Sequence, residues 1–138
     1  MKLSLLQWNA QSLRAHSNEL RQFIATTGEK PHLICVQETW LQPRLEFRFP
    51  GYSVERRDRP GGRGSGVALL ISESISYSVL DFSGVDVEAI GVKITAGDKK
   101  LTVVNIYNPP QLSIDAVAYK TLLSEPNSII VGDFNSYS

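Results

Sequence analysis

The chain has 138 residues, 42% of them hydrophobic and 20% charged, which is typical of one soluble globular domain and excludes a largely disordered segment. The 14 basic and 14 acidic side chains give a formal net charge of zero, so nucleic acid would have to be bound by a local patch or a site, not by overall charge. The single cysteine, Cys35, excludes an internal disulfide, and no apolar stretch reaches the roughly 20 residues of a membrane span. We therefore expect an intracellular protein that does not bind a membrane.

The front of the chain predicts a strand, a helix and a second strand. Residues 3–8 and 33–37 are short apolar runs that suit buried strands. Residues 17–27 predict a helix, with Ser17 as its cap, Glu19 in its first turn, and apolar residues at helical spacing along one face. A strand, a helix and a strand over this length indicate a βαβ unit with parallel strands.

The remainder of the chain predicts mainly strands. Strand-like segments span residues 52–56, 66–72, 76–80, 88–95, 100–107 and 128–131, with a hairpin turn over 96–99. Residues 113–124 predict a second helix, capped by Ser113 and followed by Pro126. These elements favour an α+β protein whose mixed, mostly antiparallel strands form two layers.

Polar side chains follow four of the apolar strands, at the point where each strand ends. They are Asn9 and Gln11, then Gln37, Glu38 and Thr39, then Tyr107 and Asn108, and finally Asp133 and Asn135. Catalytic groups are commonly carried on strand ends held by a rigid sheet. If the four ends share one edge, the carboxylates of Glu38 and Asp133, the carboxamides of Asn9 and Asn135 and the phenol of Tyr107 meet in one cleft.

That set of side chains suits phosphoryl chemistry. Carboxylates bind a hard cation such as Mg²⁺, which keeps several waters and reaches a substrate phosphate. Amide and phenol donors can bind the phosphate oxygens of the transition state. The set has neither a cluster of Cys and His for zinc nor a Ser-His-Asp arrangement.

Five motifs occur in an order that resembles the exonuclease III-like endonuclease/exonuclease/phosphatase family. They are LQWNAQSL at 6–13, QETWL at 37–41, GSGVALLI at 64–71, NIYNPP at 105–110 and GDFN at 132–135. The opening motif and NIYNPP look most like the endonuclease domain of LINE-type non-LTR retrotransposons. The resemblance covers residues 1–138 as the N-terminal portion of one such domain. It implies a two-layer β-sandwich flanked by helices, DNase I-like, here incomplete at the C-terminus.

The resemblance also implies a role for five residues. Glu38 would be the principal ligand of Mg²⁺, with Mn²⁺ as an alternative, and Asn9 would help to form that metal site. Asp133 would position or deprotonate the attacking water. Asn135 would orient the phosphate, and Tyr107 would contact it. The implied function is a metal-dependent endonuclease that nicks DNA, located in the nucleus if genomic DNA is the substrate.

Two departures from the family pattern matter. Gln11 stands where some AP-endonuclease relatives carry an acidic residue, which would alter metal binding without removing it. The closing Ser-Asp-His motif of the family does not occur before the chain ends at Ser138, and His16 and His32 lie too early to supply it. We therefore expect an impaired nuclease. Its open edge would allow self-association, and the missing part of the domain or a reverse transcriptase of the parent polyprotein would be a partner.

Other interpretations of the same sequence stay open. The chain could be an inactive fragment that binds nucleic acid or self-associates, or an AP endonuclease or phosphatase of the same family. Each predicted site residue could instead be structural, as we expect for Gln37 and Asn108. The arginines at 56, 57, 59 and 63 could bind a DNA backbone or form a solvated hairpin loop. We interpret residues 61–66 as a turn, Cys35 as a core residue, and both histidines as structural.

Overall fold

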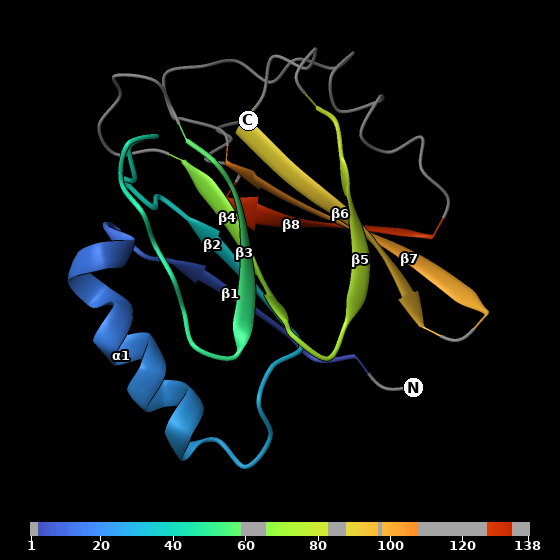
Figure 1. Ribbon diagram of the computed structural model, residues 1–138, viewed down its shortest axis with the longest axis horizontal. Helices are drawn as coiled ribbons and strands as arrows, with labels where there is room; N and C mark the ends of the chain where they lie inside the picture. The colour runs from blue at the N-terminus through green and yellow to red at the C-terminus, as the bar shows by residue number, and fades with distance from the viewer. Residues whose placement is uncertain (1–2, 59–65, 83–87, 97, 108–126, 134–138) are drawn as a thin grey trace, which may run out of the picture.

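Two four-stranded sheets face each other in the computed structural model, which describes residues 3–58, 66–82, 88–96, 98–107 and 127–133 (Figure 1). The first sheet has the strand order β1-β2-β4-β3 and the second the order β5-β6-β7-β8. The elements are β1 (Leu5–Asn9), α1 (Leu13–Thr26), β2 (Leu33–Gln37), β3 (Tyr52–Arg57), β4 (Val67–Ser72), β5 (Ser76–Leu80), β6 (Glu88–Ala96), β7 (Lys99–Tyr107) and β8 (Ser128–Asp133). The predicted α+β class with two layers is confirmed.

Strand pairing confirms the predicted βαβ unit at the front of the chain. Strands β1 and β2 are parallel, in a register that pairs Leu5 with Leu33 and Asn9 with Gln37. Strands β7 and β8 are also parallel, whereas the other described pairs are antiparallel. The β6–β7 ladder extends to the pair of residues 96 and 99, which confirms the predicted hairpin at 96–99.

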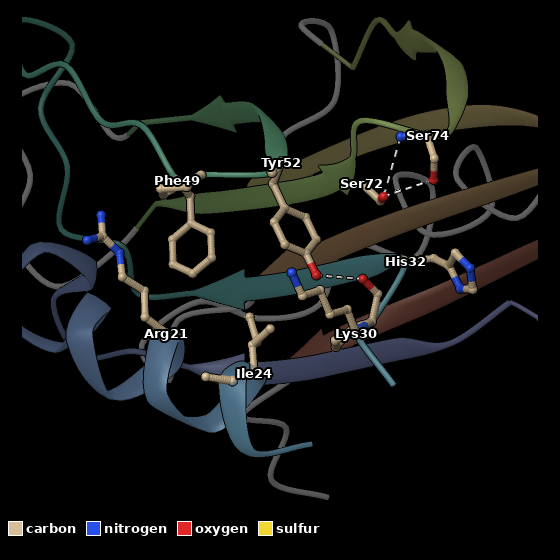
Figure 2. Close-up of a pocket in the computed structure, with 12 residues that line it drawn as sticks. Arg21, Ile24, Lys30, His32, Phe49, Tyr52, Ser72 and Ser74 are labelled. Atoms are coloured by element: carbon tan, nitrogen blue, oxygen red, sulfur yellow. Dashed lines mark hydrogen bonds between the residues drawn. The ribbon is translucent and has the colours of Figure 1, made fainter. Parts of the chain in front are cut away.

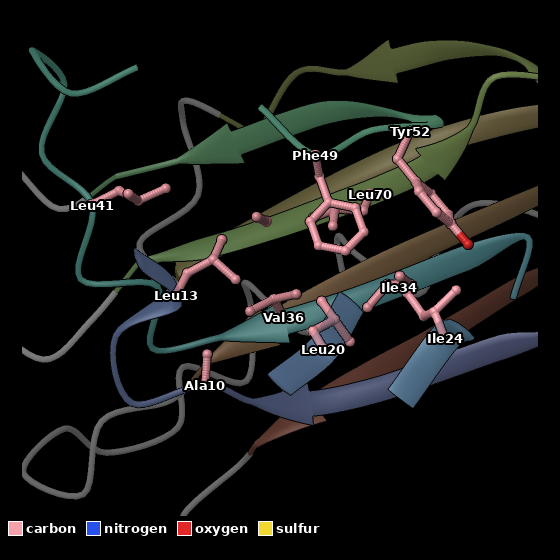
Figure 3. Packing of buried hydrophobic residues seen from close by; sticks show 11 residues of the cluster. Ala10, Leu13, Leu20, Ile24, Ile34, Val36, Leu41, Phe49, Tyr52 and Leu70 are labelled. Carbon is pink, nitrogen blue, oxygen red and sulfur yellow. The ribbon is translucent and has the colours of Figure 1, made fainter. Parts of the chain in front are cut away.

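The central strands of the first sheet are buried because both of their faces are covered. Every residue of β2 is buried, and in β4 only the last residue is partly exposed. Figure 3 shows Leu13, Leu20 and Ile24 of α1 lying against Ile34 and Val36 of β2. The other face of the first sheet packs on the second sheet. This double coverage explains why these two strands are almost continuously apolar in sequence.

One predicted boundary is wrong, and one predicted helix lies outside the described residues. Helix α1 begins at Leu13 and not at Ser17, because Ser12 caps it and accepts a hydrogen bond from Ala15 N. The first N–H groups are also bound by the loop after β2, with Leu13 N donating to Thr39 O at 2.9 Å. The helix predicted at 113–124 falls on residues that the structure does not describe. Among the described helices, none has the length and apolar character needed to span a membrane.

Candidate functional site

The carboxyl ends of β1, β2, β7 and β8 lie at one end of the sandwich. Each pair is parallel, so its two ends coincide. A hydrogen bond of 2.5 Å from Gln37 Nε2 to Asn105 Oδ1 joins the end of β2 to β7 across the two sheets. In Figure 1 the arrowheads of these four strands point to the same side of the molecule. The shared edge expected from the sequence therefore exists.

Buried amides fix the two sheets to each other at this end. Gln37 and Asn105 are fully buried. Gln7 Nε2 donates to Gln37 Oε1 at 2.7 Å, and Asn105 Nδ2 donates to the carbonyl oxygens of Val36 and Ala68 at 2.9 and 2.7 Å. A buried amide with several partners specifies one relative position of the elements that it joins. The relative position of β2 and β7 is thus set directly beside the predicted site.

Glu38 and Asn9 meet at this end of the first sheet. Asn9 Nδ2 donates a hydrogen bond to Glu38 Oε2, so the residue predicted to assist Glu38 contacts it. Glu38 is half-buried, and its backbone has a φ of 54° while its carbonyl accepts from Ser12 N at 3.0 Å. Among the described residues, no Lys, Arg or His forms an ion pair with Glu38. The negative charge of this carboxylate is therefore not neutralised by a described cationic side chain.

These donors fit a hard divalent cation. Glu38 and Asn9 offer carboxylate and carboxamide oxygens, the ligand atoms that Mg²⁺ prefers. No cluster of three or more His, Cys, Asp or Glu occurs within the described part of the chain. Mg²⁺ does not need such a cluster, because it is commonly held by one or two carboxylates and keeps several waters.

Asp133 and Tyr107 end two adjacent strands of the second sheet at the same end of the molecule. Their backbones pair directly in the β7–β8 register. Tyr107 is 6% exposed and belongs to the core between the sheets. Its burial therefore also fits the alternative that this aromatic side chain is structural. The side chain of Asp133, and the whole of Asn108 and Asn135, lie outside the described residues. The predicted roles of these residues stay predictions.

Two features of this end were missed by sequence reasoning. Asn105 was interpreted as part of an apolar strand, although one carboxamide within the run Val103 to Ile106 is a signal for a buried polar contact. Gly66 accommodates Thr39 and has a φ of 103°; a Cβ built there would lie 2.5 Å from Thr39 Oγ1. Thr39 N also donates to Gly66 O at 3.2 Å. The glycine at the start of β4 therefore supports the loop that carries Glu38.

The arginines at 56 and 57 bind the protein itself. Arg56 donates to the carbonyl oxygens of Gln42 and Leu45 and forms an ion pair of 3.2 Å with Asp58. Burial raises the pKa of Asp58, and the Arg56 guanidinium opposes that shift. Arg57 Nη1 donates to Phe82 O at 3.1 Å. The other two arginines of the cluster, at 59 and 63, lie outside the described residues.

Cys35 and the two histidines have structural surroundings, as predicted. Burial raises the pKa of the Cys35 thiol to about 12, so this group stays protonated and is a poor nucleophile at neutral pH. His16 Nδ1 lies 3.0 Å from Ser12 O on α1. His32 Nδ1 accepts from Ser4 N at 3.0 Å, next to the start of β2 and so at the end opposite Glu38.

A cavity of about 520 Å³ lies at that opposite end of the first sheet (Figure 2). Arg21 stacks over the Phe49 ring at 5.6 Å there, and Tyr52 Oη donates to Pro31 O at 2.6 Å. None of the residues predicted to be catalytic lines this cavity. The candidate site is therefore the end of the sandwich at Glu38, not this cavity.

Comparison with known proteins agrees with the fold. A family model described as "Endonuclease/Exonuclease/phosphatase family" matches residues 6–138. The endonuclease domain of TRAS1, a telomere-specific non-LTR retrotransposon, superposes with a TM-score of 0.75 at 21% identity over 99% of this chain and 61% of that domain. TDP2 from D. rerio, complexed with a single-stranded DNA product, gives 0.64 at 17% identity over 99% of this chain and 62% of that one. The AP endonuclease LMAP from Leishmania major superposes with a TM-score of 0.59 at 19% identity, over 78% of this chain and 40% of that one. The predicted DNase I-like fold is confirmed, and the chain spans less than two thirds of each of these structures.

Proposed function

This chain is a member of the endonuclease/exonuclease/phosphatase family, and from that premise we propose that it is a divalent-metal-dependent phosphodiesterase that nicks DNA. The observation that carries the proposal is the contact of Asn9 with Glu38 at the end of the sandwich where β8 also ends, at Asp133. Likeness to the TRAS1 endonuclease domain supports DNA as the substrate and a non-LTR retrotransposon as the source. A genomic DNA target would place the protein in the nucleus.

In this proposal each residue has one task in hydrolysis. Glu38 and Asn9 would hold Mg²⁺, or Mn²⁺ as an alternative, and Asn9 fixes the direction of the Glu38 carboxylate through their hydrogen bond. When bound there, the cation would supply positive charge that neutralises the phosphate oxygens and the departing oxygen. Asp133 positions or deprotonates the attacking water. Asn135 and Tyr107 donate hydrogen bonds to the phosphate and stabilise the charge that develops on it.

The proposal is tested first by metal binding, which does not depend on turnover. Mg²⁺ is expected to raise the melting temperature of the wild-type chain, because a ligand that binds only the folded state stabilises it. Glu38→Gln keeps the shape of the side chain but removes its charge, so it should abolish this shift. Glu46→Gln is the matched control, because Glu46 is exposed and pairs with Arg48. An equal Mg²⁺ shift in all three proteins would contradict the metal site.

Cleavage of supercoiled plasmid is the second test. We expect nicking that requires Mg²⁺ and falls about 100-fold or more in Glu38→Gln and Asp133→Asn. Parallel assays with abasic DNA and with inositol phosphates compare the other reactions of the family. Cleavage confined to abasic DNA would replace the nicking proposal with AP-endonuclease action, and nicking that persists in EDTA would contradict metal dependence.

A further inference from the structure

The loop that follows β2 exposes a tryptophan beside the candidate site. Thr39 and Leu41 are each 1% exposed, whereas Trp40 between them is 44% exposed. Large exposed hydrophobic residues also occur elsewhere in the described chain, at Phe23 on α1, Val79 on β5 and Ile129 on β8. Trp40 differs from these three because it lies two residues from Glu38, which places their Cα atoms within about 7 Å of each other.

The backbone of this loop is strained at both residues that it leaves accessible. Glu38 and Trp40 have φ values of 54° and 55°, a left-handed conformation that residues with a Cβ rarely adopt. Contacts within the fold hold them there: Thr39 N donates to Gly66 O, Leu13 N donates to Thr39 O, and Leu41 N donates to Thr39 Oγ1 at 3.3 Å. Strain of this kind persists where the surrounding structure imposes it and is concentrated at functional sites.

Trp40 keeps 44% of its surface exposed, so the fold leaves a large part of this aromatic side chain accessible beside Glu38. DNA bound at this end would need contacts that do not depend on electrostatic attraction to basic side chains. The chain has a formal net charge of zero, and Arg56 and Arg57 bind carbonyl groups of the protein. Stacking of a base on an aromatic face supplies affinity that does not depend on charge or on base sequence.

We propose that Trp40 is a stacking surface for an unpaired nucleobase of the nucleotide next to the phosphate bound at Glu38. The inference rests on the proposed function, because it takes DNA as the substrate and Glu38 as the metal ligand. The base is an unpaired one because both faces of a base inside a duplex are covered by its neighbours. Trp40 thus favours DNA that is single-stranded, frayed or locally opened at the point of cleavage.

Binding of a fluorescein-labelled phosphorothioate oligothymidylate, measured by fluorescence anisotropy in Mg²⁺, tests this contact without turnover, because the modified linkages resist cleavage. Trp40→Leu, which keeps an apolar side chain but removes the aromatic face, is expected to weaken binding about 10-fold. Trp40→Phe should stay within about 3-fold of wild type, since a smaller ring can still stack. Phe23→Leu is the matched control, an equally exposed aromatic near the far end of α1, and should leave the affinity unchanged. Equal melting temperatures show that the variants are folded.

Intrinsic fluorescence gives a second readout on the same contact. The chain has two tryptophans, and the oligonucleotide is expected to quench the wild-type emission but not that of Trp40→Phe, in which only Trp8 remains.

Unchanged affinity in Trp40→Leu, equal losses in Trp40→Leu and Phe23→Leu, or no binding by wild type would each overturn the inference. If Trp40→Leu binds normally while Glu38→Gln loses its Mg²⁺ shift, the inference fails and the phosphodiesterase proposal stands. A stacking effect in a protein that never responds to Mg²⁺ would support the contact and contradict the enzyme.

Discussion

Gly132 allows β8 to approach β7 closely at the position just before Asp133. Its φ is 154°, and a Cβ built on it would lie 1.8 Å from the carbonyl oxygen of Ile106, a contact that no side chain can make. We expect Gly132→Ala to shift β8 and to lower the free energy of unfolding by about 3 kcal/mol, measured by urea denaturation. Gly28→Ala is the control, because a Cβ there meets nothing within 4 Å. Equal stabilities of the two variants would show that β8 does not approach β7 this closely.

Asn105 gives a second prediction at the scale of one residue. Asn105→Leu keeps the branching and the number of heavy atoms of the side chain but leaves the buried Gln37 amide and two carbonyl groups without their partner. The expected loss is about 3 kcal/mol in the free energy of unfolding, because unsatisfied buried polar groups are costly. Asn18→Leu, on the exposed side of α1, should change stability by less than about 0.5 kcal/mol. A loss at Asn105 no larger than at Asn18 would mean that the amide does not join the sheets in solution.

The sequence identified Asn9 and Glu38 because each follows an apolar strand and lies within a family motif. For Asn105 it gave only the signal of a carboxamide inside an apolar run, because the face to which a strand residue points is not known until the partner sheet is placed. The left-handed backbone at Glu38 and Trp40 was equally hidden, because it is imposed by contacts with Ser12, Leu13 and Gly66, which are distant in the chain. Local pattern thus locates chemical groups, whereas long-range packing decides how they are held.

At the scale of elements, the start of α1 shows how tertiary contacts override a local signal. Ser17 followed by Glu19 favours a start at residue 17, but the loop after β2 binds the N–H groups of Ser12 and Leu13 and the helix begins there. We expect Ser12→Ala to lower stability by about 1 kcal/mol through loss of the cap. Ser17→Ala should be neutral or slightly stabilising, because alanine favours a helix interior. Thermal unfolding followed by circular dichroism measures both effects. A larger loss of stability in Ser17→Ala than in Ser12→Ala would indicate that the helix begins at Ser17.

Strand positions were predicted better than strand neighbours. The bounds of β2 and β5 match the expected segments, because an apolar run bounded by turn residues is a local property. The order β1-β2-β4-β3 was not predicted, since it places β4 between two strands that precede it in the chain. That placement depends on which hydrophobic faces fit together, and the period of a single strand does not contain this information.

At the scale of the whole molecule, the two sheets share the core that lies between them. The buried residues of this core come from both sheets: Leu33, Cys35, Val67, Leu69 and Ile71 from the first, and Ile90, Val92, Ile94, Val103 and Tyr107 from the second. Tyr77 Oη of β5 also donates to Glu55 Oε2 of β3 at 2.6 Å, a further polar contact between the sheets. Neither sheet can keep its inner face buried without the other, so they should unfold together.

Val92→Ala tests this cooperativity from the second sheet. Val92 is fully buried in β6, and its truncation is expected to lower the free energy of unfolding by about 2 kcal/mol through lost burial and a residual cavity. Both tryptophans lie on the side of the first sheet, Trp8 in β1 and Trp40 after β2, so their fluorescence reports unfolding there. The urea midpoint seen by fluorescence should fall together with that seen by circular dichroism. Val79→Ala, at an exposed position of β5, should move neither midpoint by much. A fluorescence transition that stays in place while the dichroism signal splits in two would mean that the sheets unfold as separate units.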